Sequence, residues 1–121
     1  MSEAKMVIDG REISSSQTPY IIAELSANHN SKLETALKII DEAAEAGADA
    51  VKLQTYRPDT ITLNSDADDF KIKGGLWDGR TLYELYEEAH MPWDWHKPLF
   101  ERARARGITI FSSPFDTTAV D

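Results

Sequence analysis

Four polar side chains lie at or near the ends of segments that are otherwise apolar. Glu24 interrupts the apolar run 20–25, Lys52 and Gln54 alternate with apolar residues in 50–55, and Ser113 ends the run 108–113. Burying an unpaired carboxylate is costly, so Glu24 must find a partner or face a polar site. Alternation places the Lys52 ammonium and the Gln54 amide on one face, where a small polar or anionic ligand could bind. These residues are the candidates for a functional site.

Each candidate also has a structural interpretation. Lys52 could extend its ammonium to solvent, and Ser113 could cap the segment that follows it. Glu24 could form a salt bridge with Lys52 across adjacent strands. That bridge is compatible with a functional role, so both interpretations of the pair stay open.

The segments around these residues read as strands and helices of an α/β protein. The run 20–25, bounded by Pro19 and an Asn-His-Asn loop, is typical of a buried parallel strand. Ser31 and Glu34 have the spacing of a capping box, which predicts a helix that begins there and ends at Gly47. Residues 50–55 predict a second strand, with Val51, Leu53 and Thr55 facing away from Lys52.

The remaining segments continue this alternation. Asp9-Gly10 between two short β-prone stretches predicts an N-terminal hairpin. The long connection 56–91 contains a short helix by the spacing of its apolar residues 82, 85, 86 and 89. A further helix is predicted over 93–106 with Gly107 as its stop, and a third strand over 108–113. Asp116 or Thr117 could cap another helix.

The order of elements predicts parallel strands joined by right-handed crossovers. A doubly wound sheet and the opening of a (β/α)8 TIM barrel both fit this order. The barrel fits the charges better, because its interior and rim accept polar side chains from several strand ends. We therefore expect a hairpin and linker over residues 1–18, and over 19–121 the first three strands of a truncated barrel, which needs about 250 residues when complete.

Composition excludes several classes of protein. The chain has 121 residues, 41% of them hydrophobic, with a formal charge of −8 and no cysteine. This charge argues against a nucleic-acid surface, which needs clustered Lys and Arg, and disulfides are excluded. No stretch is long enough to span a membrane and the N-terminus lacks a signal-peptide pattern, so we expect a cytoplasmic protein without membrane partners.

The histidines and tryptophans give weaker indications. His29 is as well explained by fixing its loop as by touching a substrate, and His90 and His96 lack the spacing of a metal pair on one helix face. Trp77 could pack or could stack on a sugar. Gly74 and Gly75 do not lie between a strand and a helix in a phosphate-binding pattern, which argues against nucleotide binding.

Three motifs in order resemble the sialic acid synthase family. They are IAELSANHN (22–30), GADAVKLQT (47–55) and FSSPFD (111–116), each matching one of the first three strand motifs of that family. The stretch KGGLWDGRTLY (73–83) is similar to the pseudaminic acid synthase branch. The resemblance covers nearly the whole chain, which corresponds to the N-terminal part of such an enzyme.

The resemblance implies condensation of phosphoenolpyruvate with an acetamido-sugar aldehyde, giving a nine-carbon 2-keto sugar acid and phosphate. For the pseudaminate branch the sugar is 2,4-diacetamido-2,4,6-trideoxy-L-altrose. It also implies a divalent metal, Mn²⁺ or Mg²⁺, whose ligands come from later strands outside this segment, and a full-length homodimer. The alternatives are an N-acetylneuraminate or legionaminate synthase fragment, another phosphoenolpyruvate-condensing barrel, or a non-catalytic α/β binding module.

The resemblance also implies a role for each candidate. Lys52 and Ser113 match positions that hold phosphoenolpyruvate, where a compact ammonium neutralises clustered anionic oxygens. Glu24 matches the glutamate between the two substrates, suited to proton handling or to orienting water. Gln54 is expected to bond the sugar, and Ser112 and Asn28 are further substrate-binding candidates. Residues 1–121 alone are expected to be inactive.

Overall fold

The computed structural model describes residues 4–121, so residues 1–3 of the predicted N-terminal segment lie outside the described part. Its strands are β1 (Met6–Ile8), β2 (Arg11–Ile13), β3 (Ile22–Glu24), β4 (Ala50–Thr55) and β5 (Thr109–Pro114). Its α-helices are α1 (Leu33–Glu45), α2 (Pro58–Ile61), α3 (Leu82–Ala89) and α4 (His96–Arg106). Single turns of 3-10 helix are η1 (Ala27–His29), η2 (Asp68–Phe70), η3 (Trp93–Trp95) and η4 (Thr117–Ala119).

The N-terminal hairpin confirms the Asp9-Gly10 prediction. Strands β1 and β2 pair antiparallel, with Ile8 opposite Arg11. Asp9 and Gly10 both have positive φ, 48° and 82°, as a two-residue type I′ turn requires. Gly10 adopts this conformation without a steric penalty, which is why the turn forms here.

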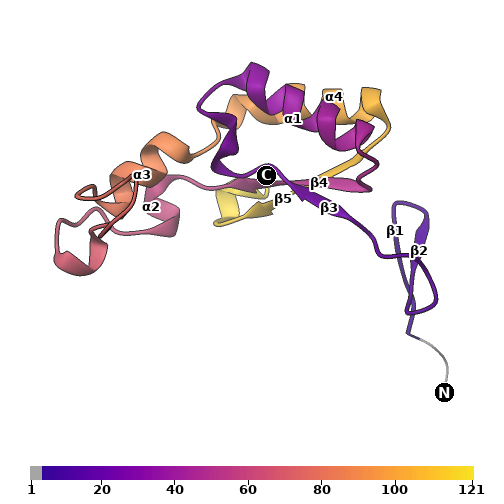
Figure 1. The fold of residues 1–121 in the computed structure, drawn as a ribbon, viewed down its shortest axis with the longest axis horizontal. Helices are drawn as coiled ribbons and strands as arrows, with labels where there is room; N and C mark the ends of the chain where they lie inside the picture. The colour runs from indigo at the N-terminus through magenta and orange to yellow at the C-terminus, as the bar shows by residue number, and fades with distance from the viewer. Residues whose placement is uncertain (1–3) are drawn as a thin grey trace.

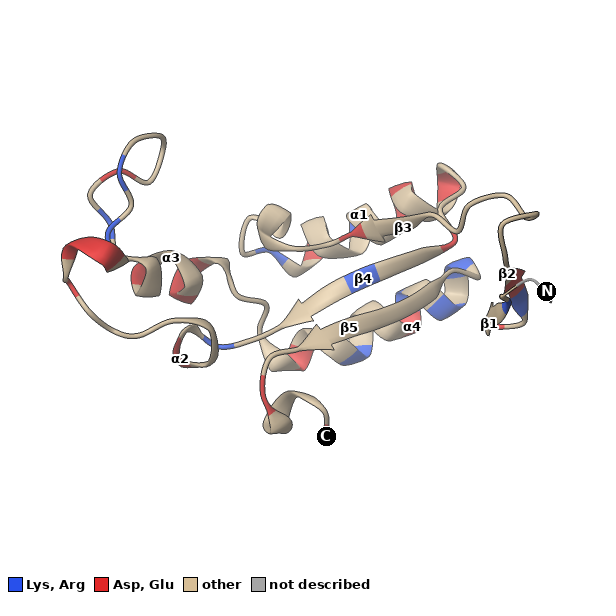
Figure 2. Cartoon of the chain, turned by 90° about the horizontal axis from the view of Figure 1, so that it is seen from below, with Lys and Arg blue, Asp and Glu red and all other residues tan. Residues whose placement is uncertain are grey.

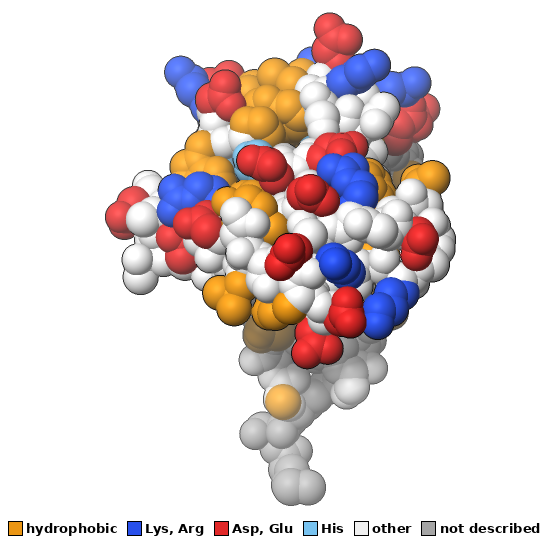
Figure 3. All heavy atoms as spheres, turned by 90° about the vertical axis from the view of Figure 1, so that its left-hand side faces the viewer, with side chains coloured by type: hydrophobic (Ala, Val, Ile, Leu, Met, Phe, Trp, Pro, Cys, Tyr) orange, Lys and Arg blue, Asp and Glu red, His pale blue; other side chains and the backbone are white. Residues whose placement is uncertain are grey.

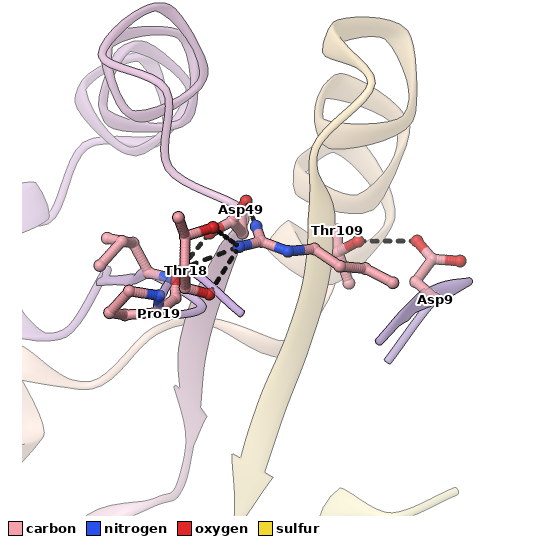
Figure 4. A network of polar contacts seen from close by, with 7 residues as sticks. Asp9, Thr18, Pro19, Asp49 and Thr109 are labelled. Atoms are coloured by element: carbon pink, nitrogen blue, oxygen red, sulfur yellow. Dashed lines mark hydrogen bonds and ion pairs between the residues drawn. The ribbon is translucent and has the colours of Figure 1, made fainter. Parts of the chain in front are cut away.

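Arg11 and Asp9 fasten the hairpin to the amino ends of the parallel strands (Figure 4). The Arg11 guanidinium forms an ion pair with Asp49, just before β4, and donates to the Thr18 and Pro19 carbonyl oxygens. The Thr109 hydroxyl, at the start of β5, donates to the Asp9 carboxylate at 2.6 Å. The hairpin therefore lies beside the amino ends of the parallel strands, and the candidate residues lie towards the carboxyl ends.

The central sheet has the order β3-β4-β5, and both pairings are parallel. This confirms that the predicted strands are parallel, and the second strand has the predicted bounds. The first strand covers only Ile22–Glu24 of the predicted 20–25, and the prediction that it is buried is wrong, because Ile22 and Glu24 are exposed. The third strand runs one residue later than predicted, over Thr109–Pro114. In the register, Glu24 lies opposite Lys52 and Gln54 lies opposite Ser113. The three strands thus bring polar residues from distant parts of the sequence to one edge.

Helices α1 and α4 pack against each other and cover one face of the sheet (Figure 1). Ala36 on α1 and Ala103 on α4 are fully buried members of the core. The core between helices and sheet contains fully buried Leu25, Ile40, Val51, Leu53 and Leu99. Burying these large side chains is the main stabilising contribution to the layer, at about 1.5–3 kcal/mol each.

The opposite face of the sheet is open and is seen from below in Figure 2. Ile22 and Phe111, which point to this side by strand alternation, are 41% and 37% exposed. The sheet therefore has one apolar, helix-covered face and one uncovered face that carries the polar candidates.

The predicted start of the first helix is wrong by two residues. Helix α1 begins at Leu33 after Lys32, and no side chain caps it. Asn30 and Ser31 instead have left-handed φ values of 52° and 54°, which end the η1 turn, and the Ser31 hydroxyl donates to the Glu88 carbonyl oxygen. A tertiary contact has thus replaced the local cap. The predicted end is confirmed, since Gly47 follows the helix with φ of 88°.

A complete capping box forms at α3 instead. Thr81 Oγ1 accepts from the Glu84 amide at 3.2 Å, and Glu84 Oε2 accepts from the Thr81 amide at 3.0 Å. The helix predicted within the long connection is thereby confirmed. The helix predicted over 93–106 is divided, because η3 precedes α4, and it ends as predicted at Gly107 with φ of 69°.

The stretch 71–81 forms a loop that is closed at its base by a bridge between Lys71 and Thr81. Asp78 accepts from the Gly74 amide at 2.5 Å, and the Arg80 guanidinium lies 5.0 Å from the centre of the Trp77 ring. Acidic, basic and hydrophobic side chains are intermingled over this end of the molecule (Figure 3).

None of the helices between residues 4 and 121 is both long and apolar enough to cross a bilayer.

Candidate functional site

Glu24 and Lys52 form an ion pair on the uncovered face of the sheet. They are direct partners in the β3–β4 register, and Lys52 Nζ lies 2.6 Å from Glu24 Oε1. The Glu24 side chain is 52% exposed and the Lys52 side chain 28%. The salt bridge with Lys52 that the sequence offered is confirmed, but Glu24 is half-exposed rather than buried, so its carboxylate does not require a partner. Because the pair is partly solvated, it contributes little to stability, and both groups are accessible to a ligand.

Gln54 and Ser113 extend this polar group along the same face. Gln54 lies two residues after Lys52 on β4, and Ser113 is its direct partner on β5. Both are half-buried. Since side chains two residues apart share a face, the structure brings Glu24, Lys52, Gln54 and Ser113 together on one surface. An ammonium, an amide and a hydroxyl are donors for the oxygens of an anionic ligand, with a carboxylate beside them.

Ser112 lies on the other side of the sheet. Its hydroxyl is 2.5 Å from Thr55 Oγ1, and that oxygen is 2.6 Å from His96 Nε2 on α4. Strand alternation turns Ser112 away from its neighbour Ser113 and towards the helices. The structure therefore separates Ser112 from Lys52, although the sequence placed both among the substrate-binding candidates.

Asn28 lies in η1, in the loop that follows β3. It is exposed, and its side-chain oxygen accepts from the Ser26 amide at 3.0 Å. That contact shapes the loop at the carboxyl end of β3, close in sequence to Glu24. The described contacts of Asn28 are local ones.

His29 is a buried loop residue, which agrees with the loop-fixing interpretation of the sequence. Its Nδ1 accepts from the Ser31 amide at 3.1 Å, and its ring packs edge-on against Trp95 at 5.1 Å. Burial lowers the pKa of His29, which favours the neutral ring that this hydrogen bond requires. The histidine therefore fixes the loop containing Asn28.

Arg57 lies at the carboxyl end of the sheet and was missed by the sequence prediction. It follows β4 as Asp116 follows β5, and its guanidinium lies 3.6 Å from the Asp116 carboxylate. Asp59 is 3.7 Å away, and the Trp93 ring centre is 5.4 Å from the guanidinium carbon. Both ion-pair distances are long. The matching positions just after neighbouring strands were the signal that could have identified this pair, because parallel strands end at the same edge.

The fit of a metal ion can be tested on the donor atoms. Within residues 4–121, no three His, Cys, Asp or Glu side chains are grouped closely enough to hold a metal ion. The four residues of the candidate site include one carboxylate, and its oxygen is paired with an ammonium. This part of the chain therefore does not itself supply a metal-ligand set.

Comparisons with known proteins identify related sequences. A family model described as the NeuB family matches residues 39–121. Pseudaminic acid synthase of Campylobacter jejuni is 65% identical over 96 residues, which are 79% of this chain and 28% of that protein. Pseudaminic acid synthase of Helicobacter pylori is 53% identical over 105 residues, 87% of this chain and 31% of that protein.

A solved structure has the same fold over the length of this chain. N-acetylneuraminic acid synthetase from Leptospira borgpetersenii, in complex with citrate, superposes with a TM-score of 0.76 at 26% identity. The match covers 98% of this chain and 36% of that one. The chain thus spans roughly a third of the length of the relatives it matches.

Proposed function

This chain belongs to the NeuB family, and we propose that it forms the N-terminal part of a pseudaminic acid synthase. In this proposal, β3, β4 and β5 are the first three strands of a (β/α)8 barrel over residues 19–121, and the hairpin and linker of residues 1–18 precede it. The uncovered face of the sheet is the barrel interior. A parallel sheet with both crossover helices on one face supports this, because that is how strands and helices are layered in such a barrel.

The proposed reaction joins phosphoenolpyruvate to the open aldehyde form of an acetamido sugar. The methylene carbon of the enol attacks the aldehyde carbon, whose oxygen takes up a proton. Water then adds to the cationic C2, and the tetrahedral intermediate loses phosphate by C–O cleavage. The products are a nine-carbon 2-keto sugar acid and inorganic phosphate.

The observation that carries the proposal is the Glu24–Lys52 pair on the open face, followed by Gln54 and Ser113. Lys52 and Ser113 bind the anionic oxygens of phosphoenolpyruvate, and Gln54 bonds the sugar. Glu24, whose Oε1 lies 2.6 Å from the Lys52 ammonium, lies between the two bound substrates in this proposal, where it orients the attacking water or accepts its proton. A divalent metal, with ligands from outside residues 1–121, would polarise the aldehyde, and the roles of these four side chains do not involve it.

Two observations indicate the sugar: the sequence of the stretch 73–83 and the 65% identity to a pseudaminic acid synthase. We therefore propose 2,4-diacetamido-2,4,6-trideoxy-L-altrose as the second substrate. The Leptospira structure favours the alternative N-acetylneuraminate reaction, at the lower identity of 26%. Comparing the two acetamido sugars as substrates distinguishes these activities.

The test uses a synthase chimera, in which residues 1–121 replace the matching N-terminal segment of Campylobacter jejuni pseudaminic acid synthase. The chimera should release phosphate from phosphoenolpyruvate only when the diacetamido sugar is present. Glu24→Gln keeps the side-chain shape and should lower kcat by about 10²- to 10⁴-fold, the usual contribution of general acid–base catalysis, while phosphoenolpyruvate still binds.

Glu12→Gln is the matched control, because Glu12 forms a similarly exposed ion pair with Lys5 in the hairpin. It should leave kcat within about twofold of the unmutated chimera, as expected for an exposed pair. A chimera that folds without turning over phosphoenolpyruvate would overturn the proposed function. Near-normal turnover in Glu24→Gln would remove the glutamate from its role.

A further inference from the structure

Three polar side chains form a connected network on the helix-covered face, directly behind the candidate site. Thr55 on β4, Ser112 on β5 and His96 at the start of α4 are joined through Thr55 Oγ1, with distances of 2.5 Å to Ser112 Oγ and 2.6 Å to His96 Nε2. Thr55 is 1% exposed. His96 Nδ1 is a further 2.9 Å from the Trp93 carbonyl oxygen.

For a neutral His96 ring, the direction of every hydrogen bond in this network follows from the Trp93 carbonyl oxygen. A carbonyl oxygen can only accept, so His96 Nδ1 carries the proton that is donated to Trp93. In the neutral ring Nε2 is then an acceptor, and the Thr55 hydroxyl must donate to it. Because this uses the only Thr55 proton, the Ser112 hydroxyl donates to Thr55 Oγ1. All three side chains are thereby satisfied in one arrangement.

The network joins the elements that carry two of the proposed ligand-binding residues. Thr55 immediately follows Gln54 on β4, and Ser112 immediately precedes Ser113 on β5. Gln54 and Ser113 are direct partners in the register and point to the opposite face. A shift of β4 relative to β5 would therefore move the Gln54 amide relative to the Ser113 hydroxyl.

We propose that Ser112, Thr55 and His96 are positioning residues that fix Gln54 and Ser113 for substrate binding. This inference rests on the proposed function. The three residues act from behind the sheet and touch neither substrate. Ser112, which the sequence placed at the ligand, acts in this arrangement through Thr55.

The network contributes more to the geometry of the strand ends than to the stability of the fold. Thr55 is buried, whereas Ser112 and His96 are half-buried and line a pocket together with Trp93, Phe100 and Pro114. A valine at position 55 would also fill the space of the threonine, and the hydroxyl adds little net stability, since its bonds replace bonds to water. A fully satisfied network does, however, select one arrangement of the elements it joins, and a donor that moves out of hydrogen-bond geometry binds its ligand more weakly.

The test compares Thr55→Val, which removes the hydroxyl and nearly keeps the shape, with Thr55→Ser, which keeps the hydroxyl. In the synthase chimera, Thr55→Val should raise the KM for phosphoenolpyruvate and for the sugar about tenfold, while kcat changes less than about threefold. Thr55→Ser should restore both KM values to within about twofold. Thr35→Val, on α1 away from the network, is the control for a threonine-to-valine change and should leave the KM values unchanged.

Loss of folded protein lowers the apparent kcat and leaves KM unchanged, so this comparison separates positioning from stability. Thr55→Val could instead leave the KM values unchanged and reduce kcat in proportion to the folded fraction measured by circular dichroism. That result would overturn the positioning role and leave the proposed function standing. Failure of Thr55→Ser to restore the KM values would also overturn the positioning role. An unmutated chimera that neither binds nor turns over phosphoenolpyruvate would overturn the proposed function, and this inference with it.

Discussion

Replacing Lys52 by methionine separates a ligand-binding lysine from a merely structural one. The change keeps the apolar stem and removes the ammonium that lies 2.6 Å from Glu24 Oε1. The pair is partly exposed, at 28% for Lys52 and 52% for Glu24, so its loss should cost only about 0.2–1 kcal/mol of folding stability. The thermal unfolding midpoint of the synthase chimera should therefore change little.

The effect on ligand binding should be much larger. If Lys52 holds the clustered anionic oxygens of phosphoenolpyruvate inside a barrel, a charge-assisted contact is lost from a partly desolvated site. Truncating such a contact costs about 2–4 kcal/mol, which corresponds to an increase of about 30- to 700-fold in Kd. Titration calorimetry of the chimera with phosphoenolpyruvate measures this value directly.

Lys5→Met is the matched control, because Lys5 also loses an ion pair, 3.1 Å from Glu12, at the surface of the hairpin. It should leave the Kd unchanged. Near-normal phosphoenolpyruvate affinity in Lys52→Met would show that Lys52 does not bind this ligand. A second result would also contradict the prediction: the unfolding midpoint of Lys52→Met falls strongly, while its Kd for phosphoenolpyruvate equals that of Lys5→Met. The Glu24–Lys52 ion pair would then be structural.

Three further predictions concern stability and selectivity. Hydrogen bonding from Arg106 lowers the pKa of Asp41, so the stability that this carboxylate contributes is present above the unfolded pKa and lost as pH falls through the folded value. As the pH falls below about 4, the free energy of unfolding measured with denaturant should fall more for the unmutated protein than for Asp41→Asn. The same pH dependence of this free energy in both proteins would contradict the prediction. Arg11→Ala should cost about 1–2 kcal/mol and make the linker 14–18 more sensitive to proteases, whereas an unchanged digestion pattern would show that the hairpin is held by other contacts. Exchanging the loop 73–83 for that of an N-acetylneuraminate synthase should change the preferred sugar and leave the phosphoenolpyruvate Kd within about twofold, and unchanged discrimination would remove the loop from that role.

Features that depend on neighbouring residues could be predicted before the structure was known. Asp9-Gly10 specified the hairpin turn, because both positions need positive φ. Gly107 specified a helix end for the same reason. The alternation in 50–55 placed Lys52 on the face opposite to the core, since side chains of a strand alternate without regard to what covers them. These signals are local, so no tertiary information was needed to read them.

Tertiary structure decided which residues from different segments meet. Whether Glu24 lies opposite Lys52, rather than one pair further along, is fixed by the register of β3 on β4, which local sequence does not encode. Alternation alone places Ser112 and Ser113 on opposite faces of a strand, but the pairing of β5 with β4 decided that Ser112 meets Thr55. Ser31 lost its predicted capping role to a contact with Glu88, 57 residues away. In each case the outcome depends on hydrogen bonds between groups far apart in the chain, which compete with the local ones only after the core has packed.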